Sequence, residues 1–164
     1  MYIVRLQSTL LYCLPAFLIA GPFLADLSIS LIGLLFLVSC FYYDNKKYFT
    51  NKYIIVLFFW YIAILTSSLL SNHVLLSLES SLFYFRFILF SLGLWFVLEN
   101  NVFFIKRFSY SFLFSFIFVI IDSYLQYFTS YNIFGYYYDG HRLSGPFGSE
   151  SVLGAYISRL LPLF

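Results

Sequence analysis

The sequence predicts an all-α, polytopic membrane protein with five transmembrane helices, the start of a sixth and a cytoplasmic N-terminus. Of its 164 residues, 62% are hydrophobic and 10% are charged, against about 45–50% and about 25% in a typical soluble domain. A chain of this length has too little interior to hide so much apolar surface from water. The 25% aromatic content excludes a disordered chain. The net charge of +2 is too small to indicate nucleic-acid binding.

The positions of the charged residues predict where the helices lie. Stretches 6–25, 27–43, 53–78, 87–98 and 108–121 contain no charge. A helix needs about 20 mainly apolar residues to cross a hydrocarbon core of about 30 Å, and lipid offers an open backbone no hydrogen-bond partners. We therefore expect one membrane domain, 1–164, with helices over about 8–25, 27–43, 53–71, 81–98 and 109–129, and a sixth helix over about 149–164.

The first two helices are expected to meet in a tight turn between Gly21 and Asp26. Each contains one cysteine, Cys13 or Cys40, which we interpret as a small packing residue. The two cysteines have neither the spacing of a metal site nor that of a disulfide framework. The sequence therefore indicates no metal and no other cofactor.

The basic residues predict the orientation of the helices, because Lys and Arg are retained on the cytoplasmic side. A cytoplasmic N-terminus places six of them on that side: Arg5, Lys46, Lys47, Lys52, Lys106 and Arg107. The opposite side receives the first turn, the connection 71–80 and the segment 130–148, of which only the last contains a basic residue other than histidine, Arg142.

Two charged residues fall within predicted membrane helices, Arg86 and Asp122. Both lie roughly 8–10 Å from the outer ends of consecutive helices at 1.5 Å per residue, so we expect them to form an ion pair. Charges at this depth are costly and often functional. Three interpretations of Arg86 stay open: a structural ion pair, a ligand for an anionic head group in an outward-facing cavity, or a side chain that extends to the outer surface.

Polar residues also follow one face of the helix over 109–129. Ser111, Ser115, Asp122 and Gln126 are spaced by 4, 7 and 4 positions, which places them on the same side. We expect this face to point away from lipid, toward protein or a water-filled cavity.

The segment 130–148 is rich in glycine and tyrosine and ends at the predicted sixth helix. Arg142 precedes this helix, for which Ser149 is the expected N-cap and Glu150 an acidic residue of the first turn. Backbone N–H groups at a helix start and a nearby arginine suit a phosphate, although Glu150 would repel an anion there.

The sixth helix carries a third basic residue at membrane depth, Arg159. We expect Arg86, Arg142 and Arg159 to converge on one outward-facing cavity that suits a substrate with several phosphate oxygens. The alternative for Arg159 is a structural ion pair with Asp122 or Glu150.

The stretch from Asp122 to Pro162 resembles the N-terminal part of proteins of the bacterial O-antigen ligase/polymerase family. Family members show an Arg-x-x-Gly-x-Phe pattern that leads into a membrane helix, matched here by Arg142, Gly145 and Phe147. The preceding segments 126–128 and 132–135 are also similar to that family.

The resemblance implies a glycosyltransferase of the bacterial inner membrane that takes a glycan from undecaprenyl diphosphate. The acceptor would be lipid A–core or a growing polysaccharide, at the periplasmic face and without metal. Arg142 would bind the carrier diphosphate, with Arg86 and Arg159 as further candidates. Asp122, Gln126, Gly145, Phe147 and Glu150 are candidates for supporting the site, and no catalytic residue is assigned.

Three classes of function therefore remain. The first is the glycan ligase or polymerase, in which case we expect the chain to be the N-terminal part of a longer protein and inactive alone. The second is a non-enzymatic transporter or flippase-like subunit for lipid-linked sugars, with the Arg86–Asp122 pair along its path. The third is a structural membrane protein whose arginines only pack.

Overall fold

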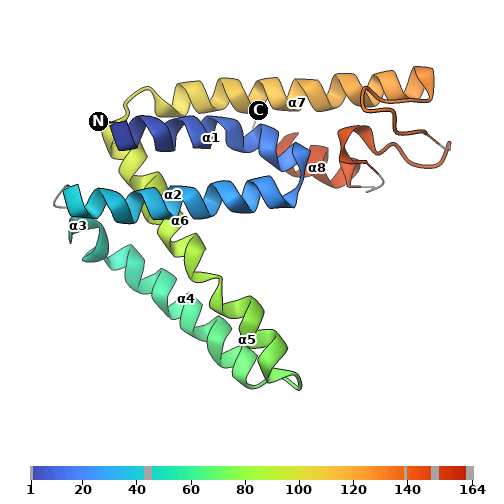
Figure 1. The fold of residues 1–164 in the computed structure, drawn as a ribbon. Coiled ribbons are helices and arrows are strands. Elements are labelled where there is room, and N and C mark those ends of the chain that lie inside the picture. Colours follow the sequence, from blue (N-terminus) through green and yellow to red (C-terminus); the bar gives the residue numbers. More distant parts are fainter. Residues whose placement is uncertain (1, 43–45, 139, 149–151, 162–164) are drawn as a thin grey trace. The chain divides into compact units, whose positions relative to one another are not determined.

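The computed structural model describes residues 2–42, 46–138, 140–148 and 152–161. Within these ranges the chain is helical, as predicted, and its only β-pairing is a bridge between Tyr131 and Tyr137. The helices are α1 (Tyr2–Ala20), α2 (Pro22–Tyr42), α3 (Lys46–Phe49), α4 (Lys52–Leu69), α5 (Val74–Leu82), α6 (Phe85–Asn100), α7 (Phe104–Thr129), the short 3₁₀ helix η1 (Gly145–Phe147) and α8 (Leu153–Leu160) (Figure 1).

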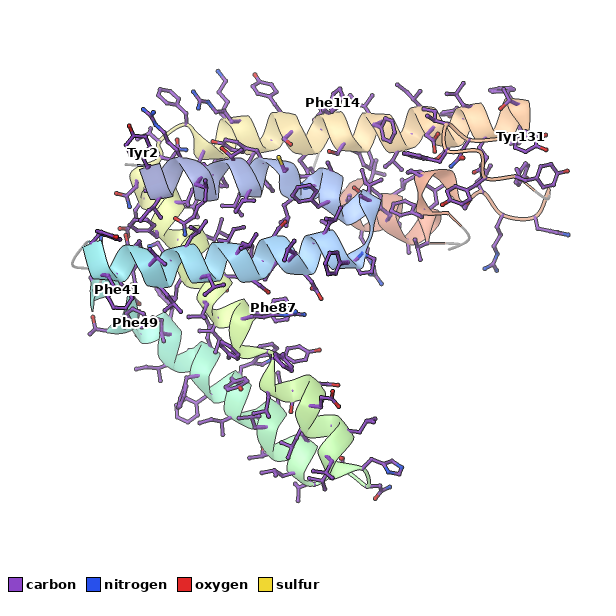
Figure 2. The ribbon with its side chains drawn as sticks, in the orientation of Figure 1. Tyr2, Phe41, Phe49, Phe87, Phe114 and Tyr131 are labelled. Atoms are coloured by element: carbon purple, nitrogen blue, oxygen red, sulfur yellow. The ribbon has the colours of Figure 1, made fainter. Side chains whose placement is uncertain are left out.

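Five helical segments are long and apolar enough to cross a membrane. They are Tyr2–Ala20, Pro22–Tyr42, Lys52–Leu69, Val74–Asn100 and Phe104–Thr129. Many of their large apolar side chains face outward: Phe41 is 88% exposed and Phe114 is 75% exposed, and both project away from the ribbon (Figure 2). Helix α4 has no buried residue at all. These surfaces suit a lipid solvent, whereas the number of spans and the orientation of the N-terminus stay predictions.

The structure moves several predicted boundaries. Helix α1 ends at Ala20 and α2 starts at Pro22, so the predicted turn from Gly21 to Asp26 shrinks to Gly21 alone. Gly21 adopts φ +139°, a conformation that L side chains rarely adopt. Proline is tolerated at a helix start because the N–H group it lacks would have no intrahelical partner there.

The predicted connection 71–80 is wrong, since most of it belongs to α5. Its serines do not stop the helix because their hydroxyls bond back to the preceding turn. Ser80 Oγ donates to the carbonyl of Leu76 at 3.4 Å, and Ser81 Oγ donates to that of Leu78 at 3.3 Å. Helix α5 contacts α4 in an antiparallel hairpin (Figure 1).

A break separates α5 from α6 inside the apolar segment Val74–Asn100. The backbone amides of Tyr84 and Arg86 bond to the carbonyls three residues earlier, at 3.1 and 3.2 Å. The carbonyl of Leu82 accepts a hydrogen bond from the hydroxyl of Tyr61 on α4 at 3.0 Å. Irregular backbone at membrane depth is tolerated where neighbouring helices satisfy it in this way.

The chain forms two compact units. Unit 1 comprises Met1–Leu11 and Asp26–Phe104, and unit 2 comprises Tyr12–Ala25 and Ile105–Phe164. The core of unit 1 gathers Phe36, Tyr48, Leu92 and Phe96. Tyr48 packs edge-on against the rings of Phe36 and Phe96, both with centroids 5.8 Å away.

Glu99 joins α3 to α6 at the edge of this core. Its carboxylate accepts from Tyr48 OH and Trp95 Nε1, each at 2.8 Å, and forms an ion pair with Lys47. The hydrogen bond to Glu99 raises the pKa of Lys47 above its ordinary 10.5. While Glu99 is ionised, the attraction is therefore fully present below pH 10.5 and is lost as the pH rises through the raised pKa of Lys47. It is also lost in acid, where the carboxylate is protonated.

We expect Glu99→Gln to lower the free energy of unfolding by about 1–3 kcal/mol, because the hydroxyl of the buried Tyr48 loses its charged acceptor. The measurement is thermal unfolding in detergent followed by tryptophan fluorescence, for which Trp95 is a local reporter. Glu79→Gln is the matched control, since Glu79 is exposed. Equal effects of the two variants would contradict the prediction.

Candidate functional site

The buried polar residues of unit 2 lie at the C-terminal end of α7, beneath the segment that follows it. Asp122 has no exposed surface. Its carboxylate accepts from the backbone N–H of Ile133 at 2.8 Å and from Asn132 Nδ2 at 3.4 Å. Among the described residues no Lys or Arg pairs with Asp122, so its role here is to hold the chain that folds back over α7.

Asn132 links the two halves of the segment. Its Nδ2 also donates to the carbonyl of Gly145 at 2.5 Å, and its Oδ1 accepts from the backbone N–H of Tyr136 at 2.7 Å. The residue is not among the candidates chosen from the sequence. The sequence does indicate a turn that Asn132 could stabilise, because Asn bonds readily to nearby backbone in turns and Asn132 stands three positions before Gly135.

Gln126, which is also fully buried, holds the Arg-x-x-Gly-x-Phe motif from below. Its Oε1 accepts from the backbone N–H groups of Ser144 and Gly145 at 3.1 and 2.8 Å. Its Nε2 donates to Ser144 Oγ at 3.1 Å and to the carbonyl of Tyr136 at 3.3 Å. The Gln126 side chain thus holds the segment after α7 at two places, at Tyr136 and at Ser144–Gly145.

Gly145 occupies a position where a larger residue would be both strained and crowded. Its φ is +56°, and a Cβ there would lie 2.8 Å from Ser123 Oγ and 3.3 Å from Leu153 Cδ1. The absence of a side chain lets η1 approach both α7 and α8. A larger residue at position 145 would therefore disturb the packing of η1 against both helices.

The predicted polar face of α7 points toward protein, as expected. Ser111 Oγ donates to the carbonyl of Tyr12 on α1, and Ser115 is 5% exposed. With Asp122 and Gln126, all four predicted residues contact protein or are buried.

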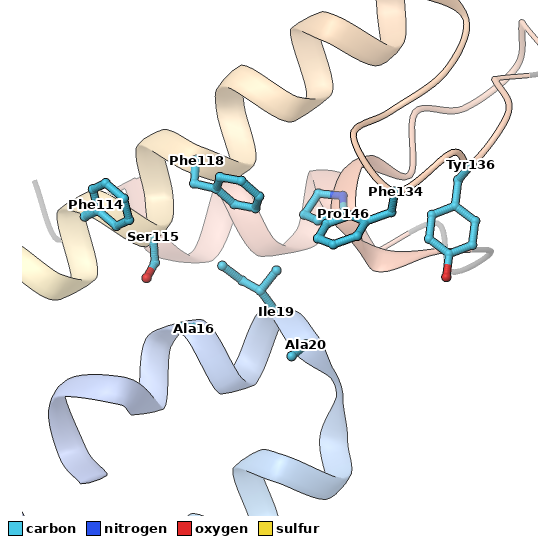
Figure 3. A pocket seen from close by; sticks show the side chains of 9 residues that line it. All are labelled: Ala16, Ile19, Ala20, Phe114, Ser115, Phe118, Phe134, Tyr136 and Pro146. Carbon is cyan, nitrogen blue, oxygen red and sulfur yellow. The ribbon is translucent and has the colours of Figure 1, made fainter. Parts of the chain in front are cut away.

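An open groove crosses unit 2 beside this face. Its first part, ≈ 450 Å³, lies between α1, α7 and the segment after α7. Figure 3 shows Ile19 of α1 opposite Phe118 of α7, with Phe134 and Pro146 at one end. Most of its lining is apolar, and Ser115 contributes a hydroxyl.

The second part of the groove, ≈ 710 Å³, shares Tyr136 and Pro146 with the first. It continues past Phe147 to α8, where Arg159 is the charged residue among the described residues of its lining. The combination of long apolar walls and one cation suits an amphiphile with an anionic head group.

Arg142 stands at the start of the motif with its side chain exposed. Among the described residues it has no hydrogen bond or ion pair, and it does not line the groove. The anchored backbone of Ser144 and Gly145 lies two and three residues after it. Its guanidinium is thus presented to solvent next to a fixed turn.

The predicted ion pair between Arg86 and Asp122 is wrong. Arg86 Nη2 lies 2.9 Å from Asp26 Oδ2 in unit 1, and Asp122 binds backbone and amide groups instead. The alternative ion pair of Arg159 with Asp122 is not formed either, since Arg159 is exposed on α8. Of the three arginines expected to converge on one cavity, Arg86 lies in unit 1, Arg159 lines the groove of unit 2, and Arg142 lines neither part of that groove.

The predicted N-cap Ser149 and the candidate Glu150 lie outside the described residues. The described part of the sixth helix runs from Leu153 to Leu160. Within the part of the chain that the structure describes, no three His, Cys, Asp or Glu side chains are grouped so that they could hold a metal ion.

Comparison of the chain with protein-family models, with curated proteins and with solved structures gives no match.

Proposed function

We propose that unit 2 forms part of the donor site of a membrane glycosyltransferase of the O-antigen ligase/polymerase type. The reaction would transfer a glycan from undecaprenyl diphosphate to lipid A–core or to a growing polysaccharide at the periplasmic face. One observation carries the proposal: the motif that bears the resemblance is held by buried side chains of α7 and presents Arg142 without a competing carboxylate among the described residues.

The chemistry requires a cation near the leaving group. An acceptor hydroxyl attacks the anomeric carbon, the bond from that carbon to the diphosphate oxygen breaks, and undecaprenyl diphosphate leaves with the bonding electron pair and added negative charge. The proton of the hydroxyl passes to solvent. Arg142, whose chain is anchored two and three residues later, would stabilise this charge more in the transition state than in the bound donor. The groove that leads to Arg159 offers apolar walls to the polyprenyl chain. Asp122 has no exposed surface, so we assign it to positioning and not to proton transfer.

A transporter or flippase-like subunit is less well supported. That alternative depended on an Arg86–Asp122 pair along a polar path. Arg86 instead pairs with Asp26, and Asp122 is enclosed by the segment after α7.

We expect Arg142→Ala to reduce glycan transfer by about 100-fold or more, the scale found when one fixed donor to developing charge is removed. The test complements a strain that lacks the gene and measures both the surface polysaccharide and the lipid-linked donor. Donor should accumulate while product disappears, and Arg142→Lys should restore part of the activity.

Arg107→Ala is the matched control, because Arg107 is an exposed arginine of the same unit. Normal polysaccharide with Arg142→Ala would exclude the enzyme proposal. A polysaccharide defect without donor accumulation at the periplasmic face would point to transport.

A further inference from the structure

A second cationic site lies in unit 1, away from the motif in the sequence and independent of the proposed function. Arg86 occupies the first turn of α6, directly after the break that follows α5. Its Nη2 binds one carboxylate oxygen of Asp26 at 2.9 Å, and its guanidinium lies 5.1 Å from the centre of the Phe87 ring. The side chain is only 30% exposed.

This arginine is incompletely satisfied. Its Nε is buried and has no hydrogen-bond partner among the described residues. A guanidinium carries five N–H donors in a planar fork, and a buried donor without an acceptor is costly because it has lost its bonds to water. The side chain keeps a 30% exposed fraction, so the exposed part of this guanidinium is suited to an anionic ligand.

A groove of ≈ 560 Å³ adjoins Arg86. Helix α2 contributes Leu34 and Leu37 to its walls, and Phe83, Phe85 and Leu89 come from the break and α6. Arg86 is the charged residue of this lining. The groove thus combines one cation with walls that suit a hydrocarbon chain.

The position of the ion pair along α2 fits the edge of a bilayer. Helix α2 has 21 residues, which span about 31 Å, close to the hydrocarbon thickness of about 30 Å. Asp26 is four residues after Pro22, or about 6 Å from that end. Leu34 and Leu37 lie about 12–16 Å deeper than Asp26. The ion pair is therefore about 6 Å inside the edge of the hydrocarbon core, a depth from which a long arginine side chain reaches toward lipid phosphates, and the apolar walls extend to the depth of acyl chains.

We propose that this groove binds one anionic phospholipid of the bilayer. Its phosphate accepts from the exposed part of the Arg86 guanidinium while Nη2 keeps its hydrogen bond to Asp26, since a guanidinium can donate to two anions at once. One acyl chain lies along Leu34 and Leu37. Phospholipids surround a membrane protein at very high local concentration. A single arginine beside one apolar groove is therefore enough to keep this site occupied.

The test is native mass spectrometry of the full chain, delipidated in detergent and titrated with phosphatidylglycerol or phosphatidylcholine. We expect one tight phosphatidylglycerol adduct, and weaker binding of phosphatidylcholine. Arg86→Gln should weaken that adduct by about tenfold or more, equivalent to about 1.4 kcal/mol. The control Arg107→Gln removes an exposed arginine of α7 and should leave the adduct unchanged.

Asp26→Asn provides a second variant that keeps Arg86. It removes the competing carboxylate, so phosphatidylglycerol should bind several-fold more tightly. Weaker binding in Asp26→Asn, equal losses in Arg86→Gln and Arg107→Gln, or equal binding of the two lipids would overturn the proposal. Stoichiometric displacement of phosphatidylglycerol by undecaprenyl phosphate would also overturn it, because the carrier lipid would then be the ligand.

Discussion

Gln126→Leu is expected to lower the free energy of unfolding by about 2–5 kcal/mol. The substitution keeps a side chain of similar size but leaves the N–H groups of Ser144 and Gly145 without their acceptor. A buried unsatisfied donor costs about 1–3 kcal/mol. The segment that carries Arg142 should then separate from α7, and glycan transfer should fall with it if the proposed function holds.

The measurement combines denaturant unfolding in detergent with hydrogen exchange over residues 140–148. Exchange at Ser144 and Gly145 should accelerate in Gln126→Leu, because their amides lose the side-chain oxygen that protects them. This readout does not depend on the proposed function, so it tests the structural role by itself.

Gln7→Leu is the matched control. Gln7 is also fully buried, but its Oε1 has no hydrogen-bond partner in the described part of the chain, and its Nε2 makes one bond, to the carbonyl of Ile32 at 3.1 Å. Leucine removes one hydrogen bond and one unsatisfied oxygen together, so the net change should stay within about 1 kcal/mol. Equal destabilisation by the two variants would show that Gln126 only fills volume.

The sequence was sufficient to predict an all-helical chain with helices long and apolar enough to span a membrane, since charge-free stretches mark such helices whatever their neighbours are. It was also sufficient to place Asp122 and Gln126 on a protein-facing side of α7, because helical periodicity fixes which residues share a face. Both predictions depend on local chain geometry alone.

The sequence did not predict the partner of Arg86, which is distant along the chain, or the helix break before Arg86, which no residue type marks. Arg86 and Asp122 were paired by their matching depth, but depth does not fix the direction in which a side chain leaves its helix. The partner found in the structure, Asp26, is 60 positions away in the sequence. The break between α5 and α6 was also missed, because no Gly or Pro marks it and the hydroxyl that satisfies Leu82 comes from Tyr61 on another helix.

Asn132 was missed for a related reason. Its function follows from two contacts that the local sequence does not define, one to Asp122 ten positions earlier and one to Gly145 thirteen positions later. Short-range turn rules indicate that asparagine bonds to nearby backbone, but they do not indicate which of several turns it joins.

Gly145→Ala is expected to have the second large effect, because it combines strain with a steric clash. The residue has φ +56°, and its new Cβ would lie 2.8 Å from Ser123 Oγ. The left-handed conformation costs an L residue about 1–2 kcal/mol, and overpacking adds about 1–3 kcal/mol. We expect a loss of about 2–5 kcal/mol in unfolding free energy, measured as for Gln126→Leu.

Three further variants separate the two causes. Gly140→Ala tests strain alone, since φ is +85° and an added Cβ would have no heavy atom within 4 Å; it should cost about 1–2 kcal/mol. Gly154→Ala, in open space on α8, should be neutral or stabilising by up to about 1 kcal/mol. Adding Ser123→Ala to Gly145→Ala removes the clashing hydroxyl without placing glycine inside α7. It should recover part of the loss, whereas no recovery would show that strain at Gly145 accounts for the whole effect.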